Sequence, residues 1–138
     1  MSKNKVILGI DPGTVITGYG LIVIEGKTPK VISFGHIDLS KITDPYQKLK
    51  MIFKRTVQLI KEYEADELAI EAPFFGKNVQ SMLKLGRAQG VAIAAALSAG
   101  LEVFEYSPRK IKLAVTGNGN ASKEQVAVFL QNTLNIKE

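Results

Sequence analysis

The sequence predicts an α/β fold built on a mixed five-stranded sheet that is flanked by helices. Short apolar runs bounded by turn residues dominate the first third of the chain, and longer stretches with apolar residues at helical spacing alternate with short apolar runs afterwards. Three strands with short connections favour an antiparallel meander, whereas strands that follow a helix favour parallel pairing. With 138 residues, of which 46% are hydrophobic, residues 1–138 are expected to form a single domain.

The first half of the chain is expected to contribute the meander and one helix. Pro12-Gly13 ends the first apolar run in a turn, and a second turn is expected at 25–27. Asp44 is suited to cap a helix, and Pro45 is suited to the first helical position. His36 is interpreted as a surface residue of a strand, because no second His is present to share a metal ion. The expected elements are strands over 5–11, 17–24 and 31–37 and a helix over 45–64.

The second half alternates strands and helices. The stretch 79–99 is rich in Ala and contains Gly86 and Gly90, although Gly costs about 1 kcal/mol relative to Ala inside a helix. These glycines therefore indicate close approach of another helix or of a ligand backbone, and a second subunit is one candidate for the outer side. Gly100 is a suitable helix stop. The expected elements are strands over 67–71 and 102–106 and helices over 79–99, 108–115 and 122–134.

Two carboxylates stand where buried strands end. Asp11 follows an apolar run and precedes Pro-Gly, and Glu71 follows a second apolar run and precedes Ala-Pro. Asp11 alone is equally consistent with a side chain that merely caps its turn. Two acids delivered to one edge of a sheet are costly without a cation between them, because each raises the pKa of the other. A divalent cation with oxygen ligands removes that cost, so the pair predicts a metal site.

The charge and composition narrow the class of function. Residues 72–123 carry seven basic and two acidic side chains, so the net charge of +5 is concentrated directly after Glu71. A basic block beside a cation site favours a polyanionic partner such as nucleic acid. The absence of Cys excludes disulfides and thiolate metal sites. No apolar signal region or membrane-length run is present, so we expect a cytoplasmic protein without membrane contact.

Four segments together carry the pattern of a known family. They are 9–14 (GIDPGT) with 17–20 (TGYG), 69–78 (AIEAPFFGKN), 83–92 (LKLGRAQGVA) and 105–112 (EYSPRKIK). In this order and spacing, over nearly the whole chain, the sequence resembles the RuvC family of bacterial Holliday-junction resolvases, in the ribonuclease H-like superfamily. The expected order of elements is also the order of that fold.

The resemblance implies a homodimeric, Mg²⁺-dependent endonuclease that nicks two strands symmetrically across a four-way DNA junction in recombination and repair. Asp11 matches the first catalytic acid of the family and Glu71 the second, and both would bind metal, with two Mg²⁺ ions per complete site. The helix near 79–99 matches the dimerisation helix. A branch-migration helicase complex is the further partner that the resemblance implies.

The resemblance also implies DNA contacts. Phe74 matches an aromatic residue that stacks on an unpaired base, a contact worth about 1–3 kcal/mol, whereas Phe75 is interpreted as a core residue. The basic residues expected on phosphates are Lys77, Lys84, Arg87, Lys112 and Lys123, the last two of which match positions near the scissile phosphate.

The sequence departs from the family pattern at its end. The family has a further helix with two acids spaced Asp-x-x-Asp beyond the position of Leu134, and this sequence stops at Glu138. Either the sequence is a shortened form or the protein has lost half of the metal ligands. We therefore expect this chain to bind Mg²⁺ weakly and to cleave poorly while it retains junction binding.

Two alternatives from other classes stay open at this point. One is a non-catalytic dimer that binds junctions through its basic face. The other is an ATPase of the actin and sugar-kinase type, whose first phosphate loop also reads Asp-x-Gly-Thr after a strand, as Asp11 to Thr14 do here. Against the ATPase, the chain is short for two such domains and shows no second phosphate loop.

Overall fold

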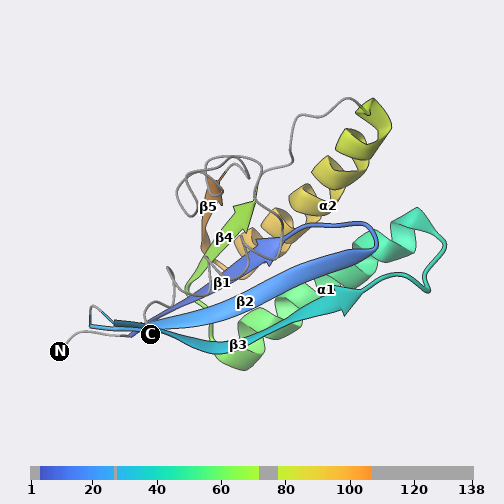
Figure 1. The fold of residues 1–138 in the computed structure, drawn as a ribbon. Helices are drawn as coiled ribbons and strands as arrows, with labels where there is room; N and C mark the ends of the chain where they lie inside the picture. The colour runs from blue at the N-terminus through green and yellow to red at the C-terminus, as the bar shows by residue number, and fades with distance from the viewer. Residues whose placement is uncertain (1–3, 27, 72–77, 107–138) are drawn as a thin grey trace, which may run out of the picture.

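The structure is a computed structural model that describes residues 4–26, 28–71 and 78–106. Its elements in chain order are β1 (Lys5–Asp11), β2 (Ile16–Glu25), β3 (Thr28–Asp38), α1 (Pro45–Tyr63), β4 (Glu67–Glu71), α2 (Val79–Ser98) and β5 (Glu102–Tyr106) (Figure 1). The predicted helices over 108–115 and 122–134 lie outside the described residues.

The five strands form one mixed sheet in the order β3-β2-β1-β4-β5. β1, β2 and β3 pair antiparallel, and β4 runs parallel to both β1 and β5. This is the α/β architecture that the sequence predicts, with an antiparallel meander followed by two parallel strands. Parallel pairing follows because a helix crosses over before each of the last two strands.

The hairpin of β2 and β3 is longer than predicted. β3 begins at Thr28 rather than at residue 31, and Ile24 of β2 pairs with Pro29. Proline lacks a backbone donor but is tolerated here, because β3 lies at the edge of the sheet. The pairing also passes over Ile32, and this β-bulge cannot be detected from the apolar alternation of one strand.

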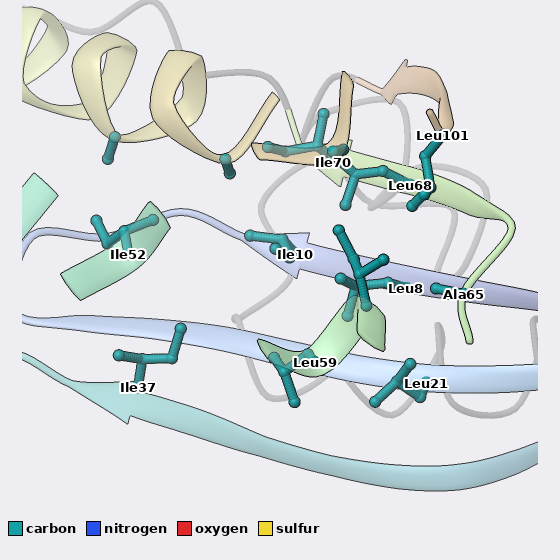
Figure 2. Close-up of a cluster of buried hydrophobic side chains, with 14 of the residues drawn as sticks. Leu8, Ile10, Leu21, Ile37, Ile52, Leu59, Ala65, Leu68, Ile70 and Leu101 are labelled. Carbon is teal, nitrogen blue, oxygen red and sulfur yellow. The ribbon is translucent and has the colours of Figure 1, made fainter. Parts of the chain in front are cut away.

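Both helices lie along one face of the sheet and pack against each other (Figure 1). Ala88, Ala92 and Ala96 of α2 are at most 1% exposed, which shows that the small residues predicted for this helix do pack closely on its sheet side. No helix in the described part of the chain has the length and apolar content needed to cross a bilayer. Figure 2 shows the core, whose larger members include Leu8, Ile10, Leu21, Ile37, Ile52, Leu59, Leu68 and Ile70.

Side chains cap the beginning of each helix. Asp44 Oδ1 accepts a hydrogen bond from the Tyr46 amide at 2.9 Å, and Asn78 Oδ1 accepts one from the Ser81 amide at 3.1 Å. These bonds satisfy amides that the first helical turn leaves without a partner. Gly100, with a φ of +83°, follows the end of α2 in a conformation that glycine adopts at no steric cost. The predicted cap at Asp44 and the predicted stop at Gly100 are confirmed.

Candidate active site

The two acids singled out in the sequence end two neighbouring parallel strands. Asp11 is the last residue of β1 and Glu71 the last residue of β4. Ile10 lies opposite Ile70 in the parallel register, and the acids are the next residues on their strands. The carboxyl ends of parallel strands lie at the same sheet edge, where ligands bind in open α/β sheets. The expectation that Asp11 and Glu71 share one edge is therefore met by the register.

Both acids lie on the sheet face opposite the one that α1 and α2 cover. Ile10 and Ile70 are at most 4% exposed and belong to the core beneath the helices. Because side chains alternate along a strand, Asp11 and Glu71 project from the opposite face, and both are half-buried. Gly18 of β2 is the Cα partner of Asp11, so the position directly opposite that carboxylate in the meander carries no side chain.

A tight turn follows Asp11. The Thr17 hydroxyl, which is fully buried, accepts a hydrogen bond from the Gly13 amide at 3.2 Å and donates one to the Gly13 carbonyl at 2.9 Å. A Cβ at Gly13 would collide with the Ile16 carbonyl oxygen. Gly13 is thus required by the compactness of the turn, and the turn fixes the end of the strand that carries Asp11.

The predicted DNA-binding residues are only partly covered by the structure. Lys84 and Arg87 are exposed on α2, which packs on the sheet face opposite the two carboxylates. His36 is exposed on β3, as the sequence predicts. The other predicted contact residues, Phe74, Lys77, Lys112 and Lys123, lie outside the described residues, as does Phe75.

The site offers two carboxylates as metal ligands. Within residues 4–26, 28–71 and 78–106, no group of three or more His, Cys, Asp or Glu side chains is arranged to hold a metal ion. Asp11 and Glu71 nevertheless provide hard oxygen ligands, which suit Mg²⁺ because that ion is bound through one or two carboxylates and keeps several waters. The donor set fits a divalent cation.

Sequence reasoning missed polar contacts of Thr17 and Gln89 near this edge. Thr17 lies on the same, core-facing side of β2 as Tyr19 and Leu21. A polar residue at such a position is itself a signal of a specific hydrogen bond. Gln89, only 9% exposed, donates from Nε2 to Glu105 Oε2 at 2.9 Å and so ties α2 to β5. Its position within a helix of small residues gave no indication of that partner.

The strand order, the helices on one face and the acids at the adjacent ends of β1 and β4 define a ribonuclease H-like nuclease fold. A family model described as crossover junction endodeoxyribonuclease RuvC matches residues 7–138. The chain therefore belongs to the RuvC family. This match favours the nuclease interpretation over the ATPase of the actin and sugar-kinase type.

Individual relatives agree with the family model. The chain is 62% identical over 136 residues to the crossover junction endodeoxyribonuclease RuvC of Christiangramia forsetii, covering 99% of this chain and 71% of the relative. It is 62% identical over 134 residues to the same protein of Bacteroides fragilis, covering 97% and 71%. Among solved structures, Thermus thermophilus RuvC in complex with a Holliday junction substrate is similar, with a TM-score of 0.78 and 29% identity over 97% of this chain and 82% of that one.

Proposed function

We propose that this chain is a structure-selective endonuclease that resolves four-way DNA junctions in recombination and repair. The observation that carries the proposal is the parallel register of β1 and β4, which sets Asp11 and Glu71 at one sheet edge. By the sequence resemblance, these two residues correspond to the catalytic acids of the RuvC family. The junction complex of the Thermus thermophilus relative supports a four-way junction as the substrate.

A divalent cation, with Mg²⁺ as the proposed ion and two ions in a complete site, is the cofactor. When bound, such ions supply an activated water and stabilise the leaving oxygen of the phosphodiester. Asp11 and Glu71 would hold the metal through their carboxylate oxygens. Both side chains are half-buried on the face away from the helices, which limits competing solvent around them.

The DNA would be positioned by basic and aromatic side chains. Lys84 and Arg87, both exposed on α2, are suited to phosphate contacts that orient a duplex arm without reading its sequence. The stacking role of Phe74 is a proposal from the resemblance. The phosphate contacts of Lys77, Lys112 and Lys123 have the same basis.

The partner of the outer face of α2 is proposed to be a second copy of the chain. Val79, Leu83 and Leu97 are 64%, 58% and 58% exposed, and they recur at helical spacing on the side opposite the core. Between them lie Gly86 and Gly90, where a Cβ atom would meet no heavy atom of another described segment within 4 Å. An apolar stripe with no side chain at its centre permits close approach of a second helix.

The helicase complex and a cytoplasmic location remain predictions from the sequence.

The test uses a labelled four-way junction with Mg²⁺. Because we expect this chain to nick weakly, the assay compares the variants with the residual wild-type rate. Asp11→Asn and Glu71→Gln are each expected to reduce that paired nicking by more than about 100-fold, because a metal ligand matters at least as much as the outer residues that support one. Junction affinity measured without metal should stay within about twofold, since neither acid binds a phosphate directly. Glu62→Gln, which changes an exposed acid near the end of α1, is the matched control and should leave nicking unchanged.

Three outcomes distinguish the hypotheses. Nicking by Asp11→Asn at the wild-type rate would show that the site is wrong. Junction binding by the wild-type chain without any nicking would favour the non-catalytic junction-binding dimer. Absence of both binding and nicking would refute the proposed function.

A further inference from the structure

The turn after Asp11 is held by hydrogen bonds to its successive carbonyl oxygens. The Gly13 carbonyl accepts from the Thr17 hydroxyl at 2.9 Å. The Val15 carbonyl accepts from the Leu39 amide at 2.8 Å, which ties the turn to the residue after β3. The Gly13 and Val15 carbonyls thus accept hydrogen bonds from groups in or directly after the strands of the sheet.

The middle carbonyl, that of Thr14, accepts its bond from α1. Lys48 Nζ donates to the Thr14 oxygen at 2.9 Å, across 34 residues of sequence, and this contact is partly buried. An ammonium group presents three donors on a flexible stem, so it can reach a main-chain carbonyl on a distant segment of the chain. The contact joins the first helix directly to the turn beside the candidate metal ligand.

Lys48 is not explained by the stability of its own helix. It lies in the first turns of α1, four residues after the cap Asp44, and α1 has no acidic residue in its first turn. The positive end of the helix dipole disfavours a cation there. Lys48 therefore opposes the helix dipole and makes a specific contact with another segment. Residues that are unfavourable for their own helix in this way are expected mainly where a functional or strained site requires them.

We propose that Lys48 is a positioning residue of the active site, whose ammonium holds the Thr14 carbonyl and thereby fixes the end of β1 that carries Asp11. The inference rests on the proposed function, in which Asp11 binds the metal. Catalytic groups must be held to within about 0.5 Å of their productive geometry, and a displacement of about 1 Å can cost about 100-fold in rate. A turn that loses its middle contact no longer holds Asp11 to that tolerance.

Amide exchange tests the contact independently of any activity. In Lys48→Met the Gly13 and Leu39 amides, whose acceptors lie in and beside the turn, should exchange about tenfold faster, the effect of losing one hydrogen bond to a charged group. Lys48→Arg keeps a donor and should restore slow exchange. Lys50→Met removes an equal charge from an exposed position of the same helix and should leave both amides unchanged.

Nicking of a four-way junction then tests the positioning role. We expect Lys48→Met to lower turnover by about 10- to 100-fold while the junction dissociation constant stays within about twofold, and Lys48→Arg to recover most of the loss. Unchanged amide exchange in Lys48→Met, unchanged turnover, or an equal loss in Lys50→Met would each overturn the inference. A wild-type chain that neither binds nor nicks junctions would instead refute the proposed function, and amide exchange would still decide whether Lys48 holds the turn.

Discussion

Replacing Gly90 of α2 by Ala should change the stability of the fold and the stability of a dimer in opposite directions. Gly90 is exposed, and apart from the adjacent backbone of its own helix no heavy atom of the described residues lies within 4 Å of the position that a Cβ would occupy. The new methyl group therefore lies in open space among the described residues, and Ala is favoured over Gly inside a helix by about 1 kcal/mol. For a domain of this size, that gain raises the melting temperature by about 4 °C.

The same methyl group acts against a second copy packed on this face. If the helices approach through Gly90, an added carbon at a packed contact costs about 1–3 kcal/mol, and a twofold interface contains the substitution twice. With that cost in each copy, about 2–6 kcal/mol in all, the dimer dissociation constant should then rise by at least about 30-fold. Gly90→Leu, with a larger side chain and a comparable gain in helix propensity, should weaken the dimer further.

The assay pairs sedimentation equilibrium with denaturant unfolding over a range of protein concentrations, so that dimerisation and folding are separated by mass action. Ser81→Ala is the matched control. Ser81 lies about 180° around α2 from Gly90 at 100° per residue, and its amide bond to Asn78 does not involve the side chain. It should raise the stability slightly and leave the dimer unchanged. A Gly90→Ala protein that is more stable and dimerises as tightly as the wild type would refute the reasoning.

Two further substitutions test the turn after β1 and a turn after β3. Gly13→Ala places a Cβ against the Ile16 carbonyl oxygen, so the backbone must move; we expect a loss of about 1–3 kcal/mol in the free energy of unfolding by urea titration, together with loss of junction nicking. Wild-type stability in that variant would show that the turn adapts freely. The pKa of Asp38 is held below its ordinary value of 3.8 by hydrogen bonds from the Ser40 hydroxyl at 2.6 Å and the Ser40 amide at 2.9 Å. The contribution of these bonds to the stability of the fold is present above pH 3.8 and is lost as the pH falls through the lowered pKa. Ser40→Ala should raise the pKa of Asp38 towards 3.8 in an NMR titration, and an unchanged pKa would assign the effect to the amide alone.

The sequence predicted the elements well where the signal is local. Asp44 and Gly100 mark helix ends through side-chain capping and backbone freedom, which act within a few residues. The hairpin bounds were less accurate, because Pro29 reads as a strand breaker until its edge position is known. A β-bulge at Ile32 depends on pairing with another strand, so no pattern within one strand reveals it.

In the candidate site, too, the features with a local sequence signal were predicted and the long-range contacts were not. Asp11 and Glu71 follow recognisable buried runs, and the helical crossover between them implies a shared sheet edge. Lys48 meets Thr14 across 34 residues through a flexible side chain, which no local pattern encodes. The only sequence signal was a lysine near the beginning of a helix, where the dipole disfavours it.

The packing of the core also determines which way the candidate metal ligands face. In a parallel pair, a slip of β4 by one residue would move Leu68 and Ile70 from the core to the open face and turn Glu71 towards the helices. Exposing the two apolar side chains costs about 3–6 kcal/mol, and burying a carboxylate without a partner costs several more. This is comparable to the whole stability of a small domain. The register that gives the sheet its core is therefore the register that brings Glu71 beside Asp11, and the fold cannot adopt the slipped register without losing its stability.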